Sequence, residues 1–596
     1  MSRRPRAWGT LLTALVAFVY AWTPLGDRDW PWHLADFGRM VRERALPWHD
    51  AFAWGSEGDF VPVHWAFELV LGAAHRAFGL LGIELVRVSL VVLAFAFLQR
   101  LVAKRGLGPL ASSALALTVA AVTRNRLLER PHLVTLLGIV LLWDRLLAFR
   151  EDTGGPGAEP PNKQKKTAWE LVPLLGVWAN MHPGVVYGAG LALGFAGFEL
   201  LRVPLATRFP SLRALPARRA GVLALWAVLG VAATLATPYG LRLYPYLFEH
   251  LGMQRLQHVA ELRPLDFSSG WDHAFLAALV IATLLLIQEA RAGDPPDLTE
   301  LLGSCAFVGL AVLAAREANL ALVCVAVMLA PVLAESIAQV RAELEGRDRG
   351  LHVFAWGFGL LLGFGLPVGS LGLQLWEGEL GSGLEQGHYP VLEADWILEK
   401  KPHGKLWNTN ASGGYLLWRL DPLANPEWRV FTDGRQPLFG HAVNRTFKDI
   451  EEKDAPNLLV LDPLSPPWEA TDFLEKFVLV HFSDGGRTYL RREGRDRELV
   501  ERFAYRHIAF CAVRDPSTFY GVRLGIGHDS ENPDEAKREL LTRALAEEPG
   551  GHWANLALAG ILLEAGDKPG AAAAARRALA VRANKDAAEI LLRASR

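Results

Sequence analysis

Long apolar segments fill the first part of this sequence and restrict the folds open to it. A helix that crosses a bilayer needs about 20 mostly apolar residues, and about eleven runs approach that length before residue 375. They cover roughly residues 7–25, 83–103, 107–123, 132–149, 168–181, 184–202, 220–236, 273–290, 297–315, 319–335 and 351–374. With 51% hydrophobic residues and a mean hydropathy of +0.17, the chain is predicted to be a mainly α-helical, multi-pass membrane protein. A disordered chain and a purely cytosolic protein are excluded.

Charge helps to orient these helices. The 62 Lys and Arg residues balance 63 Asp and Glu residues, so the net charge of −1 favours no nucleic-acid partner. Basic residues gather in alternate loops, which predicts a cytoplasmic N-terminus and C-terminal domains outside the cell. These basic groups begin with Arg3, Arg4 and Arg6 and continue within 104–105, 150–166, 202–219 and 341–349. Residues 19–21 resemble a signal-peptide cleavage site, but the first run is long and we favour an uncleaved anchor.

With this topology, unusual polar residues collect at the outer ends of the helices. They are Asp27, Asp29, His33, Arg124, Arg126, Glu129, Arg130, His132, Asn180, His182, Tyr239, Arg316 and Glu317. An ionisable group at membrane depth is costly and usually faces a cavity or a partner, so this set is the strongest functional signal in the sequence. The alternative is that each residue only caps a helix at the level of the lipid head groups.

The first outer loop, residues 26–82, is too structured for a simple connector. Trp30 and Pro31 are typical of a helix start, and the apolar spacing that follows predicts an amphipathic helix on the membrane surface. Asp29 is then either a functional carboxylate or the N-cap of that helix. His64 and Glu68 are four residues apart, on one face of a second helix.

A divalent metal cation is a candidate cofactor in the same loop. Its ligands would come from Asp27, Asp29, His33, His64 and Glu68. Because the chain has no compact ligand motif of the HExxH kind, the cofactor stays open.

The composition changes after residue 374. We divide the chain into a membrane domain (1–374), a small α/β domain (375–528) and a helical tail (529–596). Asp433-Gly434-Arg435 is either a glycan contact or simply a turn. The segment 543–546 recurs 34 residues later, at 577–580, which is typical of tetratricopeptide repeats. The tail is therefore predicted to dock on the α/β domain or on a protein partner, and an Ala-rich bundle without repeats is the alternative.

Several strings, taken in order, resemble bacterial membrane proteins with the GT-C glycosyltransferase fold. The strings are Asp27-Arg28-Asp29-Trp30-Pro31-Trp32-His33, Leu46-Pro47-Trp48-His49-Asp50, His64-Trp65-Ala66-Phe67-Glu68, Arg130-Pro131-His132, Trp178-Ala179-Asn180-Met181-His182, Thr237-Pro238-Tyr239-Gly240, Gly413-Gly414-Tyr415-Leu416 and Asp433-Gly434-Arg435. The resemblance extends over roughly residues 7–490, and its weight lies in the order of the strings.

This resemblance implies a glycosyltransferase in the bacterial inner membrane that uses a polyprenyl-phosphate-linked sugar and an acceptor glycan or protein outside the cell. It implies that an acidic residue of the first outer loop is the base, here Asp27 or Asp29. Arg28, between them, is expected to tether one of them as a salt bridge. The leaving phosphate gains negative charge, which Arg124, Arg130 or Arg316 could neutralise. His132 and His182 could donate hydrogen bonds to the same phosphate.

Two other classes of function compete with an enzyme. A non-enzymatic assembly scaffold would use the tail to gather partners. A transporter would place its polar residues near the bilayer midplane, whereas here they lie at one end of the helices.

Overall fold

The computed structural model describes residues 3–595 apart from 57, 152–167, 210–211, 213, 255–263, 266–269, 293–295, 346, 348, 436–453, 464–472, 515–521 and 583. The chain divides into two units by its internal contacts. The first combines Met1–Leu25 with Val61–Gly383, and the second combines Gly26–Phe60 with Leu384–Arg596. Much of the predicted first outer loop, residues 26–60, therefore groups with the C-terminal part of the chain.

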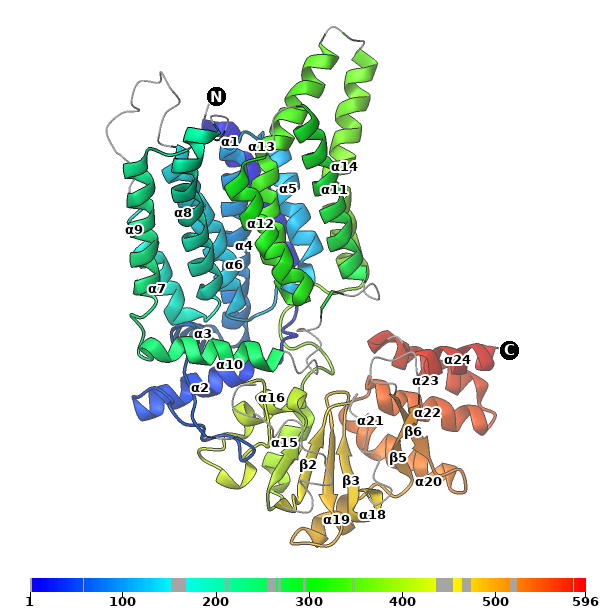
Figure 1. The fold of residues 1–596 in the computed structure, drawn as a ribbon. Helices are drawn as coiled ribbons and strands as arrows, with labels where there is room; N and C mark the ends of the chain where they lie inside the picture. The colour runs from blue at the N-terminus through cyan, green and yellow to red at the C-terminus, as the bar shows by residue number, and fades with distance from the viewer. Residues whose placement is uncertain are drawn as a thin grey trace. The chain divides into compact units, whose positions relative to one another are not determined.

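The first unit is built of helices (Figure 1). They are α1 (Arg3–Ala21), α3 (Trp65–Phe78), α4 (Leu80–Lys104), α5 (Pro109–Val122), α6 (His132–Glu151), α7 (Leu171–Met181), α8 (Val185–Arg208), α9 (Ala217–Ala233), α10 (Leu243–Gln254), α11 (Gly270–Ala292), α12 (Leu298–Leu313), α13 (Ala318–Leu344) and α14 (Arg349–Trp376). Each apolar run predicted from the sequence overlaps one of these helices.

Length and composition identify the helices that can cross a bilayer. Within the described residues, six segments qualify: Leu80–Lys104, His132–Glu151, Val185–Arg208, Asp272–Arg291, Ala315–Leu344 and Gly350–Trp376. Four further apolar helices are shorter. The protein is therefore a multi-pass membrane protein, and the total of about eleven spans stays a prediction.

The helices of this unit differ in how much they face protein. Central α13 buries its residues from Asn319 to Ala330, whereas only 6% of the apolar window of α14 is buried.

Charged residues also join the helix ends. Asp297 pairs with Arg150 at 2.8 Å and with Arg202 at 2.7 Å, which links α6 and α8 to the start of α12. Each ion is thus compensated within the unit, as burial requires.

The second unit contains α2 (Trp30–Glu43) and a small α/β domain (Figure 1). The elements of this domain are α15 (Val391–Lys400), β1 (Leu406–Asn408), α16 (Asn410–Leu420), β2 (Leu458–Leu461), α18 (Phe473–Lys476), β3 (Phe477–Phe482), β4 (Arg487–Arg491), α19 (Arg497–Phe503), β5 (Ile508–Arg514) and β6 (Val522–His528). Four strands form one sheet in the order β1-β2-β4-β3, with β1 and β2 parallel and the other pairs antiparallel. Strands β5 and β6 form a separate antiparallel pair. Strands β3 and β4 form an antiparallel hairpin, and Asp484, Gly485 and Gly486 lie in its turn.

Helix α2 packs against α16. Its first residue, Trp30, is fully buried, and its ring contacts Trp418 and Tyr389 at centroid distances of 5.1 and 5.8 Å. The prediction that the apolar face of this helix lies on the membrane is therefore wrong at Trp30, because protein covers that side chain.

The tail consists of α20 (Pro533–Glu539), α21 (Leu545–Glu547), α22 (His552–Glu564), α23 (Lys568–Val581) and α24 (Lys585–Ser595). It docks on the sheet through the β3–β4 turn. The Asp484 carboxylate accepts hydrogen bonds from the amides of His552 (2.7 Å) and Trp553 (3.2 Å) at the start of α22. His481 of β3 contacts Glu547 at 2.8 Å. The helical tail is confirmed, and its tetratricopeptide character stays a prediction.

Candidate functional site

Asp27 is held in place through both its side chain and its backbone. Its Oδ1 accepts a hydrogen bond from the Asp29 amide at 2.7 Å, so the carboxylate closes an Asx turn just before α2. Its carbonyl oxygen accepts a hydrogen bond from the Tyr389 hydroxyl at 2.6 Å, and that hydroxyl accepts one from Trp30 Nε1 at 2.8 Å. Asp27 is only 1% exposed. The side chain is therefore a well-fixed structural element of the turn.

Asp29 stands directly before the first residue of α2 and is only partly buried. Among the described residues, its side chain accepts no capping hydrogen bond from the helix. The interpretation of Asp29 as a side-chain N-cap is therefore wrong. Its Oδ1 instead lies against Gly434, where an added methyl group would overlap it.

Arg28 projects from the same turn toward His388, and its Nε lies 3.3 Å from His388 Nε2. Burial and the positive charge of Arg28 lower the pKa of His388 to about 3, so its imidazole stays neutral and accepts this bond. The Nε of Arg28 thus binds a histidine, whereas the sequence analysis expected a salt bridge to one of the aspartates.

A buried cluster of charge lies behind the turn. Arg435 contacts Asp433 through two hydrogen bonds of 2.9 and 2.7 Å, Asp50 at 3.0 Å and Asp36 at 3.8 Å. All four side chains are almost completely buried. Burial, and the charges of Asp50 and Asp433, raise the pKa of Asp36 to about 7, although Arg435 and Arg39 oppose this rise. One proton among three carboxylates reduces the excess negative charge around the single guanidinium.

Three strings that carried the family resemblance meet in this unit. The turn 433–435 lies against Asp29, and a side chain at Gly414 would meet the Arg28 carbonyl at 2.6 Å. Asn410, at the start of α16, donates a hydrogen bond to the Asp433 carbonyl at 2.6 Å. Gly414 therefore allows close approach to the Arg28 backbone, and Gly434 allows close approach to the Asp29 carboxylate.

The remaining candidates belong to the first unit, and several of them meet where α3 begins and α7 ends. Trp65 Nε1 donates a hydrogen bond to Asn180 Oδ1 at 3.2 Å. The rings of His64 and His182 lie 5.6 Å apart, and His182 Nδ1 is 2.7 Å from the Thr135 hydroxyl. The hydroxyl of Tyr239 donates to the carbonyl of Ala179, one residue before Asn180.

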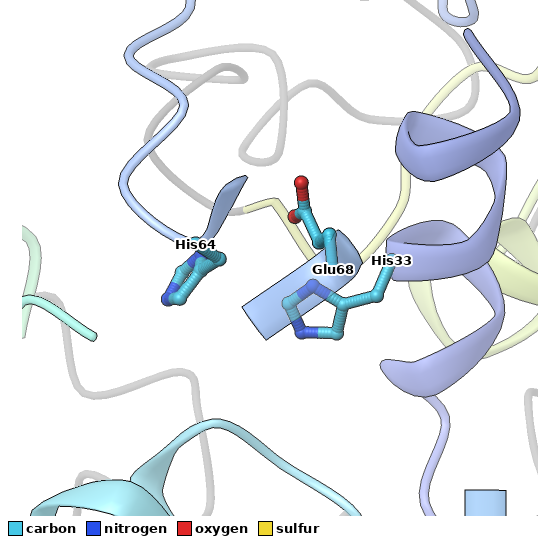
Figure 2. Close-up of side chains that lie close together, drawn as sticks. All are labelled: His33, His64 and Glu68. Atoms are coloured by element: carbon cyan, nitrogen blue, oxygen red, sulfur yellow. The ribbon is translucent and has the colours of Figure 1, made fainter. Parts of the chain in front are cut away.

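Glu68 lies one helical turn after His64 on α3, and it is 1% exposed (Figure 2). An imidazole and a carboxylate at this spacing suit a divalent cation. His33, the third side chain drawn in Figure 2, belongs to α2 in the second unit. Asp27 and Asp29, the other predicted ligands, are in the second unit as well.

The predicted phosphate ligands have protein partners. Arg124 lies 3.3 Å from Glu379 and 3.2 Å from the Ser370 carbonyl, and Arg316 binds Glu317 at 2.8 Å. His132 Nε2 is 2.6 Å from the Arg126 carbonyl. Arg130 lies two residues before His132 and is partly buried.

A buried ion pair between Arg87 and Glu129 is among the contacts that the sequence did not predict. Arg87 of α4 binds Glu129 at 2.7 Å, and both side chains are essentially inaccessible. Arg87 also donates hydrogen bonds to the carbonyls of Thr23 and Pro24, just beyond α1. A basic residue inside the apolar run 83–103 was the signal that pointed to this contact.

Comparison with known proteins finds similarity in structure but not in sequence. No protein-family model matches the chain, and no curated protein is significantly similar to it. The structure of an Archaeoglobus fulgidus oligosaccharyltransferase tethered with an acceptor peptide superposes with a TM-score of 0.54 at 13% identity, covering 83% of this chain and 74% of that one. At this identity the likeness shows the fold alone, and this fold is the GT-C fold. The predicted fold class is confirmed at this level.

Two further solved structures are less similar. ArnT from Cupriavidus metallidurans bound to undecaprenyl phosphate has a TM-score of 0.46 at 13% identity, covering 82% of this chain and 98% of that one. The mycobacterial arabinofuranosyltransferase AftD has a TM-score of 0.46 at 15% identity, covering 86% of this chain and 43% of that one.

Proposed function

We propose that this protein is a membrane glycosyltransferase that transfers a sugar from a polyprenyl-phosphate-linked donor to a glycan or protein acceptor on the extracytoplasmic side. The observation that carries the proposal is the pair Asp27 and Asp29 at the start of α2, where Tyr389 binds the Asp27 carbonyl and Asp29 lies against Gly434. It occurs in a chain whose fold is that of GT-C membrane glycosyltransferases.

The chemistry requires a base and a means to stabilise the leaving group. An acceptor hydroxyl attacks the anomeric carbon, the bond from that carbon to the phosphate oxygen breaks, and the hydroxyl proton passes to a carboxylate. The polyprenyl phosphate leaves with the bonding electrons and gains negative charge. Guanidinium groups stabilise such a charge best through bidentate hydrogen bonds.

The donor phosphate is proposed to bind to residues of the first unit. Arg124 and Arg316 each hold one carboxylate, so a phosphate would compete with Glu379 or Glu317 for them. Arg130, His132 and His182 complete the proposed cationic and hydrogen-bonding set. The intact donor is a phosphodiester with one negative charge, and its polyprenyl phosphate becomes a dianion as it leaves, so the exchange is favoured most for the leaving group.

A divalent cation is part of the proposal, with His64 and Glu68 as its ligands on α3. A bound cation would supply further positive charge to the leaving phosphate. Mn²⁺ titration of the purified full chain, followed by electron paramagnetic resonance, tests this directly. We expect wild type to bind Mn²⁺ and Glu68→Gln to lose this binding.

The topology and the tail complete the proposal. The chain would cross a bacterial inner membrane about eleven times with its N-terminus in the cytoplasm and its C-terminal domains outside. The tail, as a tetratricopeptide-like module, would bind a protein partner.

The test is mass spectrometry of polyprenyl-phosphate-linked sugars from source cells that lack this protein. One lipid-linked sugar should accumulate, and wild type should reverse the accumulation while an Asp27→Asn, Asp29→Asn double variant should not. Asp421→Asn is the matched control, because Asp421 forms an exposed pair with Arg42 in the same unit. Unchanged lipid-linked sugars in all strains would contradict the proposal.

The same strains separate the enzyme from a scaffold. A scaffold tolerates the double aspartate variant and fails when residues 529–596 are deleted, whereas the enzyme fails with the double variant. A transporter would instead tolerate both changes and depend on polar residues at the bilayer midplane.

A further inference from the structure

The two candidate aspartates are in different situations, although only one residue separates them. A general base must come within hydrogen-bond reach of the hydroxyl whose proton it takes. Asp27 is 1% exposed, and its Oδ1 already accepts the Asp29 amide hydrogen bond. Asp29 is partly exposed, and its carboxylate lies against Gly434. Of the two aspartates, Asp29 is therefore the one that a substrate hydroxyl can reach.

The turn Asp433-Gly434-Arg435 packs against Asp29. Hydrogen bonds fix its first and last residues, Asp433 and Arg435. The Asp433 carboxylate accepts hydrogen bonds from the Arg435 amide and from Arg435 Nε, both at 2.9 Å, and from Nη2 at 2.7 Å. The Asp433 carbonyl accepts a further bond from Asn410 at 2.6 Å. A turn fixed on both sides in this way cannot easily move away from Asp29.

Gly434, between the two fixed residues, makes the close approach possible. A Cβ atom at this position would overlap Asp29 Oδ1 and lie 2.9 Å from Trp32 Nε1. Real Cβ atoms essentially never come so close to other atoms, so any larger residue would displace the carboxylate or the turn.

The same arginine ties the turn to the segment that carries Asp29. Arg435 reaches Asp50 at 3.0 Å and Asp36 of α2 at 3.8 Å. Its guanidinium also lies over the rings of Phe52 and Phe60, at 5.3 and 5.6 Å from their centroids. One buried side chain therefore fixes both the turn and α2, which begins directly after Asp29.

We propose that Asp29 is the catalytic base, that Asp27 and Tyr389 are positioning residues, and that the Asp433–Arg435 turn is a platform that fixes the Asp29 carboxylate. This inference rests on the proposed function and deepens it by assigning separate roles to the two aspartates. It also assigns the Asp-Gly-Arg string to the support of the base, in place of the glycan contact that the sequence left open.

The first experiment compares single asparagine variants in the transfer assay. In Asp27→Asn, the amide oxygen still accepts the Asp29 amide hydrogen bond, so we expect a limited loss of kcat, of ~3- to 10-fold. In Asp29→Asn, the side chain cannot accept a proton, so we expect kcat to fall by at least ~100-fold. Equal losses in the two variants would overturn the assignment.

The second experiment tests the platform with a pair of glycine variants. Gly434→Ala should lower kcat by ~10- to 100-fold with a smaller change in KM, because small displacements of a reacting group are costly. The added methyl group also excludes water from Asp29, which should shift the acid limb of the pH–rate profile upward. Gly38→Ala in α2 is the matched control, because in the described part of the chain a methyl group there meets no atom within 4 Å.

Combining the substitutions separates a positioning role from a structural one. In an Asp29→Asn background, Gly434→Ala should cause no further loss of kcat, because the group it displaces no longer works as a base. A further loss of tenfold or more, or wild-type kinetics of the single Gly434→Ala variant, would overturn the platform.

Carboxyl labelling distinguishes failure of this inference from failure of the proposed function. Carbodiimide and glycine ethyl ester, applied to the purified full chain in detergent, should label Asp29 faster than Asp27 whether or not a substrate is known. Gly434→Ala should change the labelling rate of Asp29 at least threefold, and Gly38→Ala should not. If neither wild type nor any variant transfers a sugar, the proposed function is wrong. If Asp27 and Asp29 are labelled equally fast, the assignment of separate roles to them is wrong.

Discussion

Replacing Asp36 by Asn should remove a pH dependence that is built into the second unit. Asp36 is fully buried near Asp50, Asp433 and Arg435, and its pKa is raised from 3.8 to about 7. Above pH 4 the unfolded state loses this proton and the folded state keeps it. Folding stability should therefore fall as the pH rises from about 4 to about 7 and stay constant above that range.

The magnitude follows from the size of the shift. About three pKa units correspond to roughly 4 kcal/mol at 1.36 kcal/mol per unit, and complete burial of Asp36 means that solvent does not screen this effect. An asparagine has nearly the same shape and no charge to bury. Asp36→Asn should thus be stabilising above pH 7 by a few kcal/mol and neutral below pH 4.

Hydrogen exchange of peptides within residues 30–56, measured on the full chain in detergent, provides the assay. After correction for intrinsic exchange, wild-type protection should decrease between pH 5 and pH 8, while protection in Asp36→Asn should be nearly flat. The control is Asp421→Asn, whose exposed pair with Arg42 joins α16 to the same helix α2 and has no buried charge. The reasoning is refuted if wild-type protection increases with pH, or if the Asn variant keeps the wild-type slope.

Three further outcomes follow from described contacts. Asp484→Ala removes the acceptor for two amides at the start of α22, so proteolysis should release the tail faster, for a loss of about 1 kcal/mol. Burial opposes the charged form of His481, but Glu393 and Glu547 outweigh it and raise its pKa to about 9. Amide hydrogen exchange in the tail, corrected for its intrinsic rate, should therefore be slowest below about pH 6.5 and should increase as the pH passes 9 and His481 loses its proton. In Glu547→Gln this increase should begin at a lower pH. Arg87→Leu removes the cation bound to buried Glu129 and should cost about 3 to 5 kcal/mol, seen as a lower melting temperature in detergent.

The sequence predicted the helices well because the signal for each helix is local. Apolar runs such as 83–103 and 319–335 overlap α4 and α13, since the need to satisfy every backbone group inside a bilayer leaves a helix as the only option for such a run. The β3–β4 hairpin was also predictable, because Asp484 and two glycines mark the turn between its strands.

The partners of the candidate residues could not be predicted in this way. Asp27 meets Tyr389 across 362 residues of sequence, and Arg28 meets His388 across 360. Periodicity and composition report only on neighbours within a few turns, so the sequence suggested an Arg28 salt bridge with the adjacent aspartates. The same limit explains the error at Trp30, whose ring packs on Trp418 and not on lipid.

The order of the strings along the chain nevertheless contained part of this information. Glycine is needed where a side chain would overlap other atoms. Gly414 lies close to the Arg28 carbonyl, and Gly434 lies close to the Asp29 carboxylate. Each string looked weak because Gly-Gly and Asp-Gly are ordinary turn sequences when considered alone. Their shared contact with one short segment gives them a common physical cause, namely the need to hold the acidic segment that precedes α2. A search of the sequence for isolated catalytic motifs would miss such a site, because about 360 to 400 residues of sequence separate the acidic residue from the residues that fix it.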